Sequence, residues 1–297
     1  MSTSPTTSSS STTTTGIPGW TTTGNMAVAR QFHTASILGN GKVLVTGGSN
    51  GSNSLNSAEL YDITTGIWTT TGNMNYARIF HTASLLENGN VLVTGGFGRI
   101  YLSSAELYDP TTGNWTSTGN MNFAREYHTA AILRNGIVLV TGGYYKSALN
   151  SAELYNSTTG IWTITEKMVF ARQSHTASIL ENGNVLVTGG SGSSYLSSAE
   201  LYDPITSSWT TTGSMNVARE NHTASILGNG TVLVTGGSSS SYLSSAELYD
   251  PTTGSWTSTR NMNFAREYHT ASILGNGKVL VTGGYNGSNS LNSAELY

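Results

Sequence analysis

Histidine is the side chain that most readily serves as a metal ligand or as a general base near neutral pH. The sequence has six histidines, separated by 48 and then repeatedly by 47 residues: His33, His81, His128, His175, His222 and His269. A residue that recurs once per copy is best explained by something every copy needs, and we predict a side-chain hydrogen bond that ties neighbouring strands. A metal site would require all six imidazoles to converge on one axis, which no spacing rule demands.

Glutamate and arginine recur in the same way. Each glutamate stands between alanine and leucine in an apolar segment, and each arginine lies three residues before a histidine. The series are Glu59, Glu106, Glu153, Glu200, Glu247 and Glu295, and Arg30, Arg78, Arg125, Arg172, Arg219 and Arg266. An unpaired buried charge is costly, so we predict one Arg–Glu ion pair per copy, with nitrogen and oxygen within about 4 Å. Paired carboxylates suited to acid–base catalysis are not evident.

These residues belong to a repeat that covers most of the chain. The repeat also carries a tryptophan at 20, 68, 115, 162, 209 and 256, and a glycine pair that begins at 47, 95, 142, 189, 236 and 283. Each copy offers four short β segments, of the types HTASIL, VLVT, AELY and a strand with the tryptophan. An Asn-Gly pair favours a hairpin turn after the first segment, and Asp-Pro-Thr-Thr-Gly favours a turn after the third. Four strands per repeat of this length predict an all-β, six-bladed β-propeller with four antiparallel strands in each blade.

The two ends of the repeat array complement each other. The last copy stops after the AELY segment at Tyr297, and residues 19–22, around Trp20, resemble an isolated fourth strand. We predict that this N-terminal strand closes the sixth blade and removes an exposed sheet edge; an open fragment of a longer array is the alternative. The expected domains are a disordered Ser/Thr-rich tail over residues 1–15, or a glycosylated stalk in an exported protein, and a propeller over residues 16–297.

Composition narrows the function classes. Only 10% of residues are charged and the net charge is −3, so nucleic-acid binding has little electrostatic support. The absence of cysteine excludes disulfides and thiolate chemistry within this chain. Residues 1–15 lack the features of a signal peptide, and no apolar run reaches the roughly 18 residues of a membrane-spanning helix. The compartment stays open: cytoplasmic by default, extracellular for a fragment of a larger secreted protein.

The double glycine after VLVT, the tyrosine before the tryptophan and the R-x-x-H start resemble kelch repeats, in the variant also seen in the central domain of galactose oxidase-like proteins. The resemblance covers residues 16–297. It implies an interaction module whose partner lies on one face of the disc, at the mouth of a central channel. Galactose oxidase chemistry is not expected, because its tyrosine–cysteine cross-link needs a cysteine and its copper-binding histidines come from unique positions. No cofactor or metal is predicted.

In the family's geometry, two variable segments of each copy lie at that mouth: the pair between Arg and His, and the loop after the double glycine. We define the rim residues as those at which these segments could contact a partner: Phe32, Phe80, Phe97, Arg99, Tyr101, Glu126, Tyr127, Tyr144, Tyr145, Lys146, Tyr195, Glu220, Asn221, Tyr242, Glu267, Tyr268 and Tyr285. Internal variation shows that the blade itself does not dictate these positions. Exposed loops without a function are the simpler interpretation.

The leading functional hypothesis is a non-catalytic scaffold that binds a protein or peptide over the rim residues. The alternative is a carbohydrate-binding propeller, in which tyrosine and phenylalanine stack on sugar rings. A galactose oxidase-like enzyme remnant is a third and weaker alternative. A sugar site should repeat in several blades, whereas a peptide site should be asymmetric, and the uneven rim favours the peptide.

Overall fold

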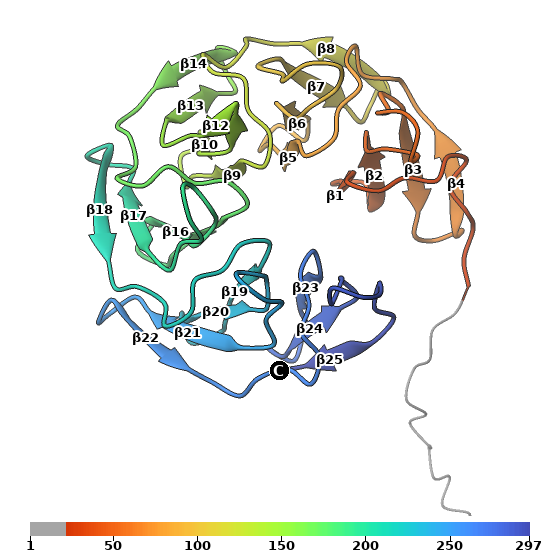
Figure 1. Cartoon of the computed structure of the whole chain (residues 1–297). Coiled ribbons are helices and arrows are strands. Elements are labelled where there is room, and N and C mark those ends of the chain that lie inside the picture. Colours follow the sequence, from red (N-terminus) through yellow and green to blue (C-terminus); the bar gives the residue numbers. More distant parts are fainter. Residues whose placement is uncertain (1–21) are drawn as a thin grey trace, which may run out of the picture.

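The computed structural model describes residues 22–297 and contains five four-stranded antiparallel sheets and one three-stranded sheet, arranged as the blades of a ring (Figure 1). Within the described residues there is no helix long and apolar enough to cross a membrane. The predicted six-bladed, all-β propeller is confirmed.

Within each blade the strands are given from the channel outwards. Blades 1 to 3 contain β1 (Thr34–Ile37), β2 (Lys42–Thr46), β3 (Ala58–Asp62) and β4 (Ile67–Thr70) in blade 1; β5 (Thr82–Leu85), β6 (Val91–Thr94), β7 (Ala105–Asp109) and β8 (Asn114–Ser117) in blade 2; and β9 (Thr129–Ile132), β10 (Val138–Thr141), β13 (Ala152–Asn156) and β14 (Ile161–Ile164) in blade 3. Blades 4 to 6 contain β15 (Thr176–Ile179), β16 (Val185–Thr188), β17 (Ala199–Asp203) and β18 (Ser208–Thr212) in blade 4; β19 (Thr223–Ile226), β20 (Val232–Thr235), β21 (Ala246–Asp250) and β22 (Ser255–Ser258) in blade 5; and β23 (Thr270–Ile273), β24 (Val279–Thr282) and β25 (Ala294–Leu296) in blade 6.

Local chemistry explains the turns within a blade. In blade 2 the Asn-Gly turn between β5 and β6 places Gly89 at a φ of 84°, a left-handed conformation that glycine adopts without strain. In the turn between β7 and β8, the Asp109 carboxylate accepts a hydrogen bond from the backbone N–H of Thr111. These two turns give neighbouring strands the register that buries all four residues of β6.

The core of the ring lies between adjacent blades. One cluster joins Leu44 and Met74 of blade 1 to Val91, Val93 and Tyr108 of blade 2. Tyrosine and tryptophan rings of the same blade lie 5.0–5.1 Å apart between centroids in blades 1 to 5. In blades 2 to 5 the indole N–H also donates to a backbone carbonyl of the preceding blade. The repeated tryptophan therefore fastens blade to blade.

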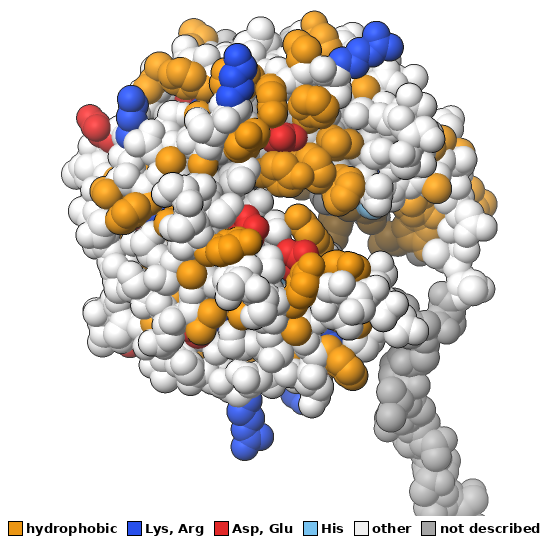
Figure 2. Space-filling model, in the orientation of Figure 1, with side chains coloured by type: hydrophobic (Ala, Val, Ile, Leu, Met, Phe, Trp, Pro, Cys, Tyr) orange, Lys and Arg blue, Asp and Glu red, His pale blue; other side chains and the backbone are white. Residues whose placement is uncertain are grey.

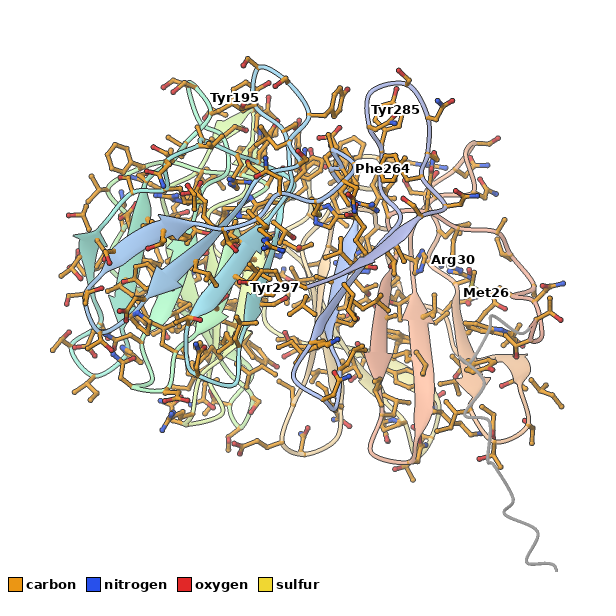
Figure 3. All side chains as sticks on the ribbon, turned by 90° about the horizontal axis from the view of Figure 1, so that it is seen from below. Met26, Arg30, Tyr195, Phe264, Tyr285 and Tyr297 are labelled. Carbon is orange, nitrogen blue, oxygen red and sulfur yellow. The ribbon has the colours of Figure 1, made fainter. Side chains whose placement is uncertain are left out.

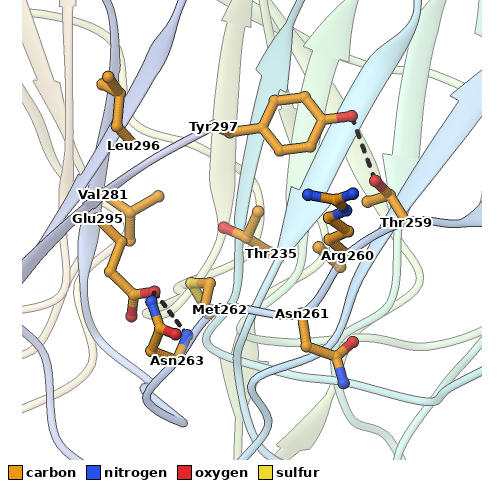
Figure 4. A pocket seen from close by; sticks show the side chains of 11 residues that line it. Thr235, Thr259, Arg260, Asn261, Met262, Asn263, Val281, Glu295, Leu296 and Tyr297 are labelled. Carbon is orange, nitrogen blue, oxygen red and sulfur yellow. Dashed lines mark hydrogen bonds between the residues drawn. The ribbon is translucent and has the colours of Figure 1, made fainter.

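The sixth blade shows three strands in the described residues, and the predicted closing strand around Trp20 lies outside them. A pocket of about 480 Å³ runs along β25 and is lined by Met262, Val281 and Leu296 (Figure 4). Tyr297 bonds Thr259 there, as the other framework tyrosines bond a threonine of the preceding blade, but no tryptophan packs on its ring among residues 22–297. The free edge thus leaves room for one more strand with a tryptophan.

We expect Trp20→Ala to lower the free energy of unfolding by roughly 3 kcal/mol, as burial of a sixth tryptophan between blades implies. Thr23 supports this placement, since its hydroxyl bonds that of Tyr61 at 2.7 Å, the contact that a fourth strand of the preceding blade makes elsewhere. Urea denaturation measures the change, with Trp115→Ala as the matched variant and deletion of residues 1–15 as the control. An unchanged midpoint for Trp20→Ala beside a lowered one for Trp115→Ala would contradict the closing strand.

Candidate functional site

The framework arginines and glutamates form the predicted ion pairs in all six blades. The guanidinium nitrogen and the carboxylate oxygen are 2.6–2.9 Å apart, and the arginine side chains are fully buried. In blade 3, Arg125 also donates to the carbonyl oxygens of Gly142 and Ser151, while Glu153 accepts the backbone N–H groups of Asn122 and Phe123. Each pair therefore fixes the segment between two blades onto its own blade, and the terminal guanidinium nitrogens and the carboxylate are bonded to the scaffold.

The framework histidines join neighbouring blades, as predicted, in five of six cases. In His81, His128, His175, His222 and His269, Nε2 lies 2.9–3.4 Å from two threonine hydroxyls of the preceding blade. Burial, followed by the charge of Arg78, lowers the pKa of His81 to about 3. These imidazoles are neutral at physiological pH. His33 in blade 1 differs because it is exposed. The equivalent threonines of blade 6, Thr270 and Thr282, bond each other without it.

The glycine pair gives the next histidine its space. A Cβ on Gly95 would lie 2.7 Å from Cε1 of His128, and a Cβ on Gly96 would lie 2.9 Å from Cβ of His81. Both glycines also have positive φ angles, of 61° and 91°. The double glycine thus permits close approach of two blades, and the chain turns away from it into the loop that carries rim residues.

The two variable segments of each copy meet at one end of the disc. Backbone bridges pair the residue after each framework arginine with the loop after the double glycine; examples are Ile79 with Phe97, Glu126 with Tyr144, and Glu267 with Tyr285. Seen from the side, Tyr195 and Tyr285 lie on loops at the same edge of the molecule (Figure 3). The structure therefore brings the rim residues together at one mouth, and their role in binding stays a prediction.

A ring of unusual backbone conformations surrounds the mouth. The residue before each framework histidine has a φ of 52–56°, which is uncommon for residues other than glycine: Phe32, Phe80, Tyr127, Ser174, Asn221 and Tyr268. From blade 3 to blade 6, the backbone N–H of this residue donates to the carbonyl of its counterpart in the preceding blade, at 3.0–3.2 Å. This chain of backbone bonds, which spacing alone did not reveal, links the mouth residues of blades 2 to 6 in an arc above the innermost strands.

Aromatic rim residues concentrate on the first three blades. Phe32, Phe80 and Tyr127 form a row with centroid distances of 4.6 and 4.1 Å, and the second pair is stacked. Farther from the axis, Tyr101 lies 5.2 Å from Phe97 and 5.4 Å from Tyr145. Figure 2 shows hydrophobic side chains gathered around the mouth, with acidic atoms among them. The result is an aromatic surface over blades 1 to 3 made of two groups of contacting rings.

The remaining rim residues are more dispersed. Tyr242 and Tyr285 form an edge-to-face pair at 5.7 Å, whereas Tyr195 has no aromatic partner in the part of the chain that the structure describes. Arg99 is exposed, and the Lys146 ammonium lies 5.4 Å from the ring centre of Tyr145. The loop of blade 3 forms an additional short hairpin, β11 (Tyr144–Tyr145) with β12 (Ser147–Ala148), which the sequence did not predict.

Below the mouth, the channel between the innermost strands contains a cavity of about 650 Å³. Its lining comes from small and aliphatic side chains on β5, β9, β15, β19 and β23, such as Ala130, Ser178 and Ile226. Over residues 22–297, no cluster of three or more histidine, aspartate or glutamate side chains could hold a metal ion.

Comparison with known proteins agrees with the geometry. The model of the KLHDC2/KLHL20/DRC7 kelch-repeat domain matches residues 70–231, and the kelch motif matches residues 32–75, 221–263 and 268–297. A search of the curated proteins finds no match to the chain. The matches span the same repeats whose arginine, glutamate, histidine and double glycine build the blades. The chain therefore belongs to the kelch-repeat family.

Proposed function

We propose that the protein is a non-catalytic scaffold that binds a protein or peptide over the rim residues. Kelch propellers generally bind proteins. The observation that carries the proposal is the exposed aromatic surface over blades 1 to 3, at positions where the copies differ. The Tyr145 side chain is 39% exposed and is not part of the buried core between blades. Exposed aromatic groups of this kind are frequent energetic centres of protein interfaces.

The rim is asymmetric, which favours a peptide over a sugar. Blades 1, 2, 3 and 6 present phenylalanine or tyrosine before the framework histidine, whereas blades 4 and 5 present Ser174 and Asn221, and only blades 1 to 3 stack these rings on one another. A glycan-binding propeller would be expected to repeat its aromatic platform in several blades. The framework arginines and glutamates form ion pairs within the scaffold, and five of the six framework histidines bond threonines of the preceding blade, which supports a role without catalysis.

Selection of random peptides on the intact propeller tests this function. We expect bound peptides to lose affinity roughly tenfold or more with the double variant Tyr144→Ala/Tyr145→Ala, because removal of an interface aromatic side chain typically costs over 1 kcal/mol. The control is Ile205→Ala, since Ile205 is 93% exposed in the turn between β17 and β18, at the opposite end of the strands. Glycan binding without any peptide binding would instead favour the carbohydrate alternative.

A further inference from the structure

Three blades carry a glutamate directly after the framework arginine, and two of these side chains have a hydroxyl partner. Oε2 of Glu220 accepts a hydrogen bond from the Ser191 hydroxyl at 2.5 Å, and Oε2 of Glu267 accepts one from Ser238 at 2.6 Å. Each serine belongs to the loop of the preceding blade. Glu267 also accepts the side-chain N–H of Asn221 at 3.1 Å. The scaffold therefore directs a glutamate at this position toward the loop and the mouth residue of the blade before it.

Glu126 occupies the same position in blade 3 and lacks these donors. In the blade before Glu126, the loop position that holds Ser191 or Ser238 in the other two cases holds Phe97. The backbone of Phe97 pairs with Ile79 in the same way that the backbone of Ser191 pairs with Gln173. Asn221, which precedes the framework histidine of blade 5, donates to Glu267 of blade 6. The equivalent residue of blade 2, before Glu126 of blade 3, is Phe80, which has no side-chain donor. Glu126 as a whole residue is only 8% exposed, and across residues 22–297 its carboxyl has no hydrogen bond or ion pair. The carboxyl oxygens are not fully closed off from solvent, and a mostly buried carboxyl without a protein partner is uncommon in a folded protein.

Aromatic residues occupy positions next to Glu126. Its backbone pairs with that of Tyr144, and Tyr127 follows it in the chain. After burial, the negative charge of Glu126 contributes to the raised pKa of both Tyr101 and Tyr127. Tyr127 presents a ring stacked on Phe80. Burial alone raises the pKa of Glu126 to about 7. The neighbourhood thus combines a titrating carboxyl with several aromatic residues, and within residues 22–297 no basic side chain forms an ion pair with Glu126.

A lysine or arginine side chain is complementary to both the carboxyl and the aromatic residues. Its charge would pair with the carboxylate and lie against ring faces, whose quadrupole attracts cations, while its aliphatic stem would cover the rings. We infer that Glu126, Phe80, Tyr101 and Tyr127 form a receptor for a lysine or arginine side chain of the partner. This inference rests on the proposed function, because it assumes a protein or peptide at the rim. The neighbouring titratable groups include Tyr101 and Tyr127, whose pKa values are raised mainly by burial, so these two side chains stay neutral near pH 7.

The sharpest probe is a pair of small amides, N-acetyl-arginine amide and its neutral isostere N-acetyl-citrulline amide. Nuclear magnetic resonance of the glutamate side-chain carboxyl carbons would follow Glu126 in the full chain. We expect the arginine amide to shift the Glu126 resonance and to lower its apparent pKa, with affinity roughly tenfold or more above that of the citrulline amide, because a hydrogen bond between two charged groups is stronger than one to a neutral group. Binding should strengthen between pH 6 and pH 8 as the carboxyl ionises.

Two variants separate this site from a general effect on the fold. Glu126→Gln should abolish the preference for arginine and still fold, because Gln31 and Gln173 occupy the same position in other copies. Phe97→Ser should supply the missing hydroxyl, return the Glu126 pKa toward the ordinary range of a carboxyl and weaken the response to the amide. Glu87→Gln is the control, since Glu87 is exposed in the turn between β5 and β6, at the opposite end of the strands.

The outcomes distinguish this inference from the function on which it rests. Equal responses to the two amides, or an unchanged response in Glu126→Gln, would overturn the receptor. Peptide binding that depends on Tyr144 and Tyr145 would then retain the proposed function without it. Absence of peptide binding would overturn the proposed function, whereas an arginine-specific response of Glu126 would still establish the basic-side-chain site.

Discussion

Arg125→Ala lowers the free energy of unfolding by about 3–5 kcal/mol, the cost typical of leaving one member of a buried ion pair without its partner. Arg125 and Glu153 are both fully buried, with 2.8 Å between their charged atoms. The substitution also removes the donors to the carbonyl oxygens of Gly142 and Ser151. Equilibrium denaturation in urea measures the loss. The matched control is Arg134→Ala, because Arg134 is an exposed arginine in the turn between β9 and β10, and its removal should cost far less.

A double substitution tests why the loss is large. Replacement of a buried ion pair by apolar residues is often neutral or stabilising. Arg125→Met/Glu153→Leu should nevertheless remain destabilised by roughly 2 kcal/mol or more, because backbone groups on both sides lose their partners. Those groups include the N–H of Asn122 and of Phe123, which donate to Glu153. A double variant as stable as the wild type would show that the pair acts by charge alone and does not hold the segment between blades.

Acid is the second large perturbation, because five buried histidines must stay neutral in the folded ring. The pKa of His81 is lowered to about 3 and that of His269 to about 4, each mainly by burial, and the pKa values of the other three are well below the ordinary value. With a folded pKa below the unfolded pKa of about 6.5, each group binds more protons when unfolded. Stability is therefore full above pH 6.5 and falls as the pH drops toward 4, by up to about 1.4 kcal/mol per pH unit for each imidazole.

Thermal unfolding from pH 7.5 to pH 4 checks this expectation. His128→Asn should be less stable at pH 7.5 and should show a shallower fall between pH 6.5 and pH 4, because one titrating imidazole is gone. Glu126 acts with the opposite sign: its raised pKa gives stability that is present below pH 4.5 and lost as the pH rises through 7. Measurement in the Glu126→Gln background removes that contribution. A melting temperature that stays constant between pH 7 and pH 5 would contradict the neutral, buried imidazoles.

Much of the scaffold could be predicted from sequence because the same physical requirement recurs in every copy. A glutamate between alanine and leucine in an apolar strand needs a cation, and one arginine per copy supplies it. The turn signals at Asn-Gly and Asp-Pro gave strand ends that the structure confirms to within a residue or two. The family geometry also placed the two variable segments at one mouth, where the backbone bridges now connect them.

The hydrogen-bond partners of individual rim residues could not be predicted from the sequence of a single repeat, because they come from the preceding repeat. Glu126, Glu220 and Glu267 are equivalent in the repeat, yet their partners come from the blade before, 29 residues earlier along the chain for the two serine contacts. Comparing each glutamate with the loop of the preceding copy would have revealed Phe97 opposite Glu126. The positive φ of Tyr127 had no sequence signal either, because tyrosine is not a residue that favours this conformation.

Hydrogen exchange with and without a selected peptide tests the central claim most directly, namely that the partner binds where the copies differ. The account predicts slower amide exchange in residues 97–101, 126–127 and 144–146 of the wild-type propeller, and no such protection in Tyr144→Ala/Tyr145→Ala at the same peptide concentration. Protection confined to the Asp-Pro turns at the opposite end of the strands, with the rim segments unchanged, would contradict it.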